Sequence, residues 1–143
     1  MEYFQKKNGI IIKLILHCII PILVGLSIYV LFRGINIIDS SRKTFPLFQF
    51  RPADFILYNI PDGLWLYSFL SSIAIIWKNN SSLHFKYWIL IAIVLSFLSE
   101  FLQIILWLPG TFDLLDLLVY IMATTIFLVN FRFTISIISP TSK

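Results

Sequence analysis

The amino-acid sequence predicts an all-α, polytopic membrane protein with four transmembrane helices, and three observations lead to this prediction. Hydrophobic residues make up 59% of the 143 residues and charged residues only 13%, whereas a soluble domain is about half apolar and about a quarter charged. A chain this short cannot bury so much apolar surface in one aqueous core. The Lys and Arg residues lie at the ends of the apolar runs. We therefore expect one membrane-embedded helical domain over residues 1–143.

Each predicted span is an apolar run close to the roughly 20 residues that a helix needs to cross a bilayer. The first, residues 10–32, is too long for a signal peptide and is followed by no small-x-small cleavage site. Residues 87–108 and 113–133 form the third and fourth runs. The second, residues 57–77, has a short apolar centre and needs its N-terminal residues or local bilayer thinning to cross. The alternative is three spans plus a re-entrant segment.

The positions of the basic residues predict an N-in and C-in orientation in the inner (cytoplasmic) membrane. With the N-terminus inside, the cytoplasmic side carries seven Lys or Arg residues and the outer side four. Every acidic residue except Glu2 then lies on or toward the outer side. Any chemistry of the acidic side chains is therefore expected to face outward.

Polar or small residues recur at helical spacing within every run. Each predicted helix therefore has one face whose polar groups cannot form hydrogen bonds with lipid. These residues are Lys13, His17, Pro21 and Gly25 in the first run, Ser68, Ser71 and Ser72 in the second, Ser96, Ser99, Glu100 and Gln103 in the third, and Asp113, Asp116, Tyr120 and Thr124 in the fourth. We expect these faces to turn inward, with the Lys13 ammonium group reaching the inner interface. Contact between helices explains the serines and His17 without any further role.

Glu100 is the main candidate for a functional residue, because it lies about two turns below the outer end of its helix. An acid at that depth costs on the order of 2–3 kcal/mol. The structural alternative is a protonated Glu100 bonded to Tyr120 or Ser99. A tight turn at Pro109–Gly110 makes the third and fourth helices antiparallel neighbours and places Glu100 near Tyr120 or Ile121.

The last predicted helix begins shortly after this turn. Asp113 is placed to cap that helix, and Asp116 then stands at the third helical position, like the acid of a capping box. The cap explains Asp113, while Asp116 also lies on the inward face.

The spacing of these residues resembles the C-terminal half of VanZ-like membrane proteins, or a related uncharacterised family of small bacterial polytopic membrane proteins. The patterns that carry the resemblance are Glu100-x-x-Gln103, Pro109-Gly110, Asp113, Asp116-x-x-x-Tyr120-x-x-Ala123 and Pro61-Asp62-Gly63-Leu64-Trp65. VanZ-like proteins carry Asn and Gly where this chain has Tyr120 and Ala123. The resemblance implies a multi-pass protein of the bacterial inner membrane and, for the named members, an effect on sensitivity to lipoglycopeptide antibiotics. VanZ-like proteins usually carry Arg where this chain has Thr111, which puts an anionic ligand in doubt.

Three classes of function fit these residues. The first is an outward-facing acidic pocket that binds an amphipathic or lipid-linked cell-envelope molecule. Its candidate ligand-binding residues are Asp62, Trp65, Glu100, Gln103, Asp113, Asp116 and Tyr120, with Trp107 at the rim. The second is a membrane enzyme in which paired carboxylates act as general acid and base. The third is an accessory subunit of a membrane complex, or a proton or cation path through Glu100.

Several other classes lack their sequence signals. No zinc-binding His-Glu-x-x-His pattern, Gly-rich phosphate loop or nucleophile motif is present, so we expect neither a cofactor nor a metal. The basic residues form no single patch, which argues against nucleic acid as a partner. Membrane lipids are the expected partners, and the sequence identifies neither the ligand nor the oligomeric state.

Overall fold

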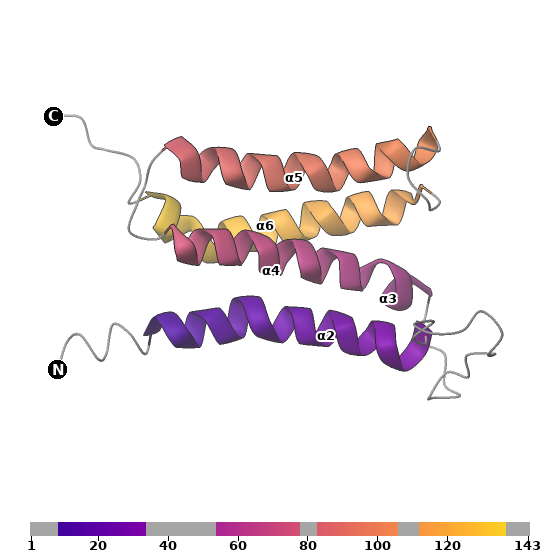
Figure 1. Ribbon diagram of the computed structural model, residues 1–143, viewed down its shortest axis with the longest axis horizontal. Helices are drawn as coiled ribbons and strands as arrows, with labels where there is room; N and C mark the ends of the chain where they lie inside the picture. Colours follow the sequence, from indigo (N-terminus) through magenta and orange to yellow (C-terminus); the bar gives the residue numbers. More distant parts are fainter. Residues whose placement is uncertain (1–8, 34–53, 78–82, 106–111, 137–143) are drawn as a thin grey trace, which may run out of the picture.

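The computed structural model describes residues 9–33, 54–77, 83–105 and 112–136, and all regular elements in these ranges are helices (Figure 1). Three of the helices are long and apolar enough to cross a membrane: Gly9–Leu31, His84–Ile104 and Leu114–Phe131. They confirm the helical fold class and correspond to the first, third and fourth predicted spans.

The first helix is regular only in its middle part, α2 (Ile20–Ile28), which lies between two π-helical segments, η1 (Ile15–Ile19) and η2 (Tyr29–Arg33). At the end of η1, the N–H of Ile20 donates to the carbonyl of Ile15, five residues back. Pro21 has no N–H to give to the helix, so a local change of hydrogen-bonding pattern beside it is expected.

The second predicted span is divided in the structure. It corresponds to the end of α3 (Asp54–Tyr58) and all of α4 (Ile60–Ile76), which are separated by a turn at Asn59. The 17 residues of α4 are fewer than the roughly 20 that a spanning helix needs. The structure therefore confirms three apolar helices of spanning length, and a fourth span is not established by length.

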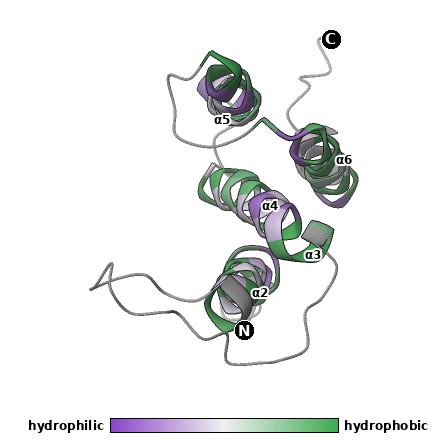
Figure 2. Ribbon diagram, turned by 90° about the vertical axis from the view of Figure 1, so that its right-hand side faces the viewer, coloured by the Kyte–Doolittle hydropathy of each residue, from purple (hydrophilic) through white to green (hydrophobic). Residues whose placement is uncertain are grey.

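The remaining helices are α5 (Leu83–Ile104) and α6 (Leu114–Ser136). Helix α4 lies at the centre of the arrangement, with α2 on one side and α5 and α6 on the other (Figures 1 and 2). The colour order in Figure 1 shows that α4 and α6 run in the same direction and α5 in the opposite one. The start of the first helix and the end of α6 lie at the same end of the bundle.

The core lies between α4, α5 and α6, while most other apolar side chains point outward. The core residues are Leu66, Leu70, Ile73, Ala74, Phe85, Ala92, Tyr120, Ala123, Phe127 and Phe131. Only 17% of the most apolar window of the first helix and 11% of that of α5 is buried. A molecule with apolar side chains on its outside is suited to a lipid environment.

The predicted polar faces turn inward in the part of the chain that the structure describes. Ser68 and Ser71 are fully buried, Glu100 is 3% exposed, and Pro21 and Gly25 are buried as well. Lys13, on the predicted polar face of the first helix, is exposed and does not turn inward with Pro21 and Gly25.

Two glycines allow α4 to approach its neighbours closely. A Cβ atom added at Gly63 would stand 2.1 Å from Cγ1 of Val119 on α6. A Cβ atom added at Gly25 on α2 would stand 2.9 Å from Nε1 of Trp65 on α4. Real Cβ atoms do not come so close to other heavy atoms, so both contacts depend on the missing side chain.

Candidate functional site

The start of α6 forms the first part of the site. The backbone N–H of Leu115 donates to Oδ1 of Asp113 at 2.9 Å, and the N–H of Asp116 donates to the Asp113 carbonyl at 3.2 Å. Asp113 is therefore the helix cap that the sequence predicts, and Asp116 stands at the third helical position. The positive end of the helix dipole favours carboxylates at both positions.

Asn59 joins these two carboxylates to α4. Its side chain is 2% exposed, and Nδ2 donates to Oδ2 of Asp113 at 3.0 Å and to Oδ1 of Asp116 at 2.7 Å. The first of these bonds lowers the pKa of the Asp113 carboxyl, and the Leu115 N–H adds to the effect. The turn between α3 and α4 thus places one amide where it donates both to the capping Asp113 and to Asp116 in the first turn of α6.

Sequence reasoning missed Asn59. An Asn just before a helix-starting Ile60-Pro61 pair is a signal for a helix cap, yet this side chain makes no capping bond to its own helix. Its partners lie on α6, 54 and 57 residues away in the chain. Only the close approach of α4 and α6 gives it this role.

Glu100 lies beside this cluster and is incompletely satisfied. The Tyr120 hydroxyl donates to Oε1 at 3.5 Å, and Nε2 of Gln103 donates to the same oxygen at 3.4 Å. Both distances are at the long limit for a hydrogen bond. Oε2 is buried and has no partner among the described residues. The predicted proximity of Glu100 and Tyr120 is confirmed, whereas Ser99 donates to the Ser96 carbonyl instead.

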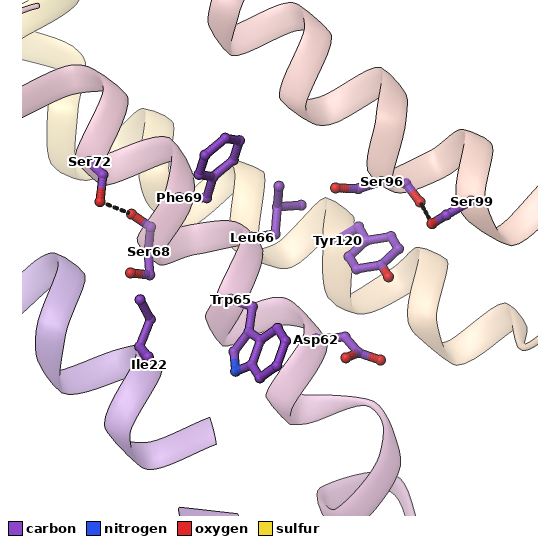
Figure 3. Close-up of a pocket in the computed structure, with 10 residues that line it drawn as sticks. All are labelled: Ile22, Asp62, Trp65, Leu66, Ser68, Phe69, Ser72, Ser96, Ser99 and Tyr120. Atoms are coloured by element: carbon purple, nitrogen blue, oxygen red, sulfur yellow. Dashed lines mark hydrogen bonds between the residues drawn. The ribbon is translucent and has the colours of Figure 1, made fainter. Parts of the chain in front are cut away.

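A cavity of about 580 Å³ forms the second part of the site (Figure 3). Its lining residues come from all four long helices and are Ile22, Asp62, Trp65, Leu66, Ser68, Phe69, Ser72, Ser96, Ser99 and Tyr120. Figure 3 shows the Tyr120 hydroxyl pointing toward the level of Asp62. Tyr120 therefore belongs to both parts, because it lines the cavity and donates to Glu100.

The hydroxyl groups of the four serines in this lining all donate within the protein. Ser68 donates to the Cys18 carbonyl at 2.6 Å, and Ser72 donates to the Ser68 carbonyl at 2.9 Å. Ser96 and Ser99 donate to the carbonyls of Ala92 and Ser96 at 3.0 and 2.7 Å. A hydroxyl that donates a hydrogen bond keeps lone pairs with which it can accept one. The lining is largely apolar, and among its polar side chains the serines and the Asp62 carboxylate offer mainly acceptors.

The seven predicted binding residues thus occupy two adjoining compartments. Asp62, Trp65 and Tyr120 line the cavity. Glu100, Gln103, Asp113 and Asp116 form the polar cluster behind Tyr120 and are not among the lining residues. Trp107 and the Pro109–Gly110 turn lie outside the described residues.

A separate polar contact links the first helix, α4 and α6. The Tyr67 hydroxyl hydrogen-bonds Nδ1 of His17 and accepts from Nδ2 of Asn130 at 3.0 Å. The His17 ring also packs edge-on against Phe131, with ring centroids 5.4 Å apart. His17 has a structural role here, as contact between helices predicts. Tyr67 and Asn130 were not predicted, because neither lies on a polar stripe in the sequence.

Within the described residues, no group of three or more His, Cys, Asp or Glu side chains is arranged to hold a metal ion. Comparisons with protein-family models, with curated proteins and with solved structures give no match for this chain. Any account of its function therefore depends on the geometry of the two compartments.

Proposed function

We propose that this chain is a multi-pass protein of a bacterial inner membrane that binds an amphipathic or lipid-linked envelope molecule in the cavity beside α4. In this proposal the head group lies toward Asp62 on the outer side, and the apolar part extends along Trp65 and Phe69. Membership of a VanZ-like family, and with it an effect on antibiotic sensitivity, belongs to the same proposal and depends on the short motifs given above.

The observation that carries the proposal is the acceptor-rich lining of a cavity among apolar helices. The four serine hydroxyls donate hydrogen bonds to backbone carbonyls and keep lone pairs for accepting, and Asp62 adds a carboxylate. Such a lining favours head groups rich in donors, such as sugar hydroxyls or an ammonium group. It disfavours a phosphate or carboxylate, which brings acceptors and negative charge to an acid.

Aromatic side chains at the cavity support access from the lipid side. Trp65 and Phe69 line the cavity and are 50% and 57% exposed. Helices α2 and α5, which both contribute lining residues, lie on opposite sides of α4 (Figure 2). An acyl chain could therefore remain in the bilayer while the head group occupies the cavity.

Tryptophan quenching tests this binding. Variants that retain only Trp65 or only Trp88 are placed in bilayers of brominated phosphatidylcholine, which quenches both. The two indoles are 50% and 51% exposed, so Trp88 is a matched control for contact with bulk lipid. Glucosyl diacylglycerol and phosphatidic acid with identical acyl chains are then added at equal mole fractions.

The glucosyl lipid should relieve quenching at Trp65 more than phosphatidic acid does, with no such difference at Trp88. Ser96→Phe, which fills the cavity, should abolish the difference at Trp65. Leu98→Phe, at a 43% exposed position of the same helix, should retain it. Equal relief by both lipids at Trp65 would contradict the proposal.

The proposed topology has four spans with both termini in the cytoplasm, and α3 and α4 together provide the second crossing. The larger number of Lys and Arg residues on the cytoplasmic side supports this topology. The start of the first helix and the end of α6 also lie at the same end of the bundle. In a Cys18→Ser background, an impermeant reagent should label Ser41→Cys from outside and spare Ser81→Cys. Equal labelling of both sites would mean that α4 does not cross, and labelling of Ser81→Cys alone would reverse the orientation.

The alternatives from the sequence receive less support. An enzyme with Glu100 and Asp116 as acid and base needs both near the substrate, and neither lines the cavity. An accessory subunit would present its polar stripes to partner helices, whereas Ser68, Asn59 and Tyr120 make their contacts within this chain.

A further inference from the structure

Glu100 stands one side chain away from the cavity, and that side chain is Tyr120. The Tyr120 hydroxyl donates to Oε1 of Glu100, and the same residue lines the cavity. Its ring is held edge-on against Phe97 on α5, with ring centroids 5.8 Å apart. Glu100 itself is 3% exposed, and its Oε2 has no partner in the described structure. A buried carboxyl oxygen without a partner requires an explanation.

The charged and titratable groups around Glu100 are mainly acidic. From the start of α6, Asp116 and Asp113 lie close enough to repel a charge on Glu100, while the Asp113 backbone N–H lies close enough to favour that charge. From α4, Asp62 acts on Tyr120. Gln103, on the same helix as Glu100, contributes a neutral amide. The lysines whose side chains the structure describes, Lys13 and Lys86, are near the starts of the first helix and of α5, at the other end of the bundle.

We propose that Glu100 is a proton-binding site, and that the Tyr120 hydroxyl couples its occupancy to the cavity. This inference rests on the proposed ligand-binding function. In the proton-loaded form, a proton from water is bound to a carboxyl oxygen of Glu100. In the unloaded form that proton has returned to water, and the carboxylate accepts from Tyr120 and Gln103.

The direction of the coupling follows from the acceptor-rich cavity. A ligand hydroxyl or ammonium group that donates to the Tyr120 oxygen polarises the phenol and makes it a stronger donor toward Glu100. That stronger bond stabilises the carboxylate relative to the acid, so ligand binding releases the proton. By reciprocity, loss of the proton tightens ligand binding. A cationic ligand acts in the same direction through its charge.

The test measures the relief of Trp65 quenching by glucosyl diacylglycerol as a function of pH, in the full-length protein. In the wild type the apparent affinity should rise by about fivefold or more as Glu100 loses its proton. Glu100→Gln, which keeps an uncharged side chain of similar size, should bind weakly at every pH. Tyr120→Phe keeps the ring against Phe97 but removes the coupling hydroxyl, so its affinity should not change with pH.

Infrared spectroscopy tests the proton site without any ligand. Acidification protonates all seven acidic side chains, so the Glu100 contribution is read from the difference between the wild-type and Glu100→Gln spectra. That difference should contain a carboxylic-acid C=O component, and the component should still be present in Tyr120→Phe. Asp116→Asn removes one of the charges that repel a charge on Glu100, so it should keep the Glu100 absorption and the pH-dependent affinity but shift both to lower pH.

The outcomes separate this inference from the function on which it rests. Identical C=O absorption of the wild type and Glu100→Gln on acidification would overturn the proton site, and a wild-type affinity that does not vary with pH would overturn the coupling. If the two lipids relieve Trp65 quenching equally at every pH, the ligand-binding function is contradicted and the coupling with it. The infrared measurement would still decide whether Glu100 binds a proton. If Glu100→Gln does not fold, pH dependence retained in Tyr120→Phe overturns the coupling.

Discussion

The two sides of α4 are built differently. Toward α6, Gly63 lets the helices touch at Val119 and Asn59 fixes the helix starts to each other, so this contact is close. A smaller pocket of about 290 Å³ borders it on the side of α2. Elsewhere along α4, small serines border a cavity of about 580 Å³ that α2, α5 and Tyr120 of α6 also line. The contrast teaches that the packing around α4 varies from one contact to the next, because the position of Gly63 admits not even one additional methyl group.

The largest expected effect comes from Gly63→Ala, on the closely packed side. In an exposed helix this change would stabilise by up to about 1 kcal/mol. Here the new Cβ would stand 2.1 Å from Cγ1 of Val119, a β-branched residue with few rotamers in a helix. We expect destabilisation near the upper end of the about 1–3 kcal/mol range for overpacking, measured as thermal unfolding in detergent.

A second substitution on α6 controls this result. Val119→Ala removes the methyl group that the new Cβ would meet, so the pair Gly63→Ala and Val119→Ala should be more stable than Gly63→Ala alone. Additive losses in the double variant would mean that the two helices do not meet at these residues.

Asn59→Ala should have the next largest effect. It removes the donor shared by Asp113 and Asp116, and we expect a loss of about 1–2 kcal/mol in thermal or denaturant unfolding. Asn130→Ala is the matched control, since the exposed Asn130 also donates to a side chain on α4 but water can replace it. Equal losses of stability for the two variants would show that the Asn59 bridge contributes no more than an exposed hydrogen bond does.

Gly25→Ala tests the open side and should have a smaller effect than Gly63→Ala. Its Cβ would stand 2.9 Å from the Trp65 indole, but that ring is half-exposed and can turn away. We expect a loss of less than about 1 kcal/mol, together with a shift of Trp65 fluorescence in the variant that retains only this tryptophan. A loss as large as that of Gly63→Ala would erase the difference between the two sides.

The smallest expected effect is on the acid dependence of stability. Donation from Asn59 and from the Leu115 N–H lowers the pKa of Asp113 in the folded protein. Ionised Asp113 therefore contributes stability above its unfolded pKa, and this contribution is lost as the pH falls through its folded pKa. Asp113→Asn should show a flatter dependence of the melting temperature on pH than the wild type below about pH 5. Parallel curves would contradict the assignment.

Much of the fold could be predicted from local patterns. Length and hydropathy located the first helix, α5 and α6, and the turn-then-acid pattern before Leu114 predicted the Asp113 cap. Helical spacing placed Glu100 next to Tyr120. These features depend on residues within one helix or on two helices joined by a short turn.

The rest could not be predicted because it depends on how distant segments meet. Helix α4 is apolar on several sides, so its sequence does not reveal that it occupies the centre. Asn59 looks like a cap for its own helix, and only contact with α6 makes it a bridge. The division of the seven candidate residues between a cavity and a cluster depends on which way Tyr120 points.

The central position of α4 has a consequence for biosynthesis. If the bundle assembles in a bilayer as it is made, α4 emerges from the ribosome before either α5 or α6. Until α6 is made, Asn59 has no carboxylates of Asp113 and Asp116 to donate to, and Gly63 has no Val119 to pack against. A segment of 17 residues with such groups is poorly suited to remain alone in lipid. Its final insertion would then be a late event that waits for the C-terminal helix to leave the ribosome.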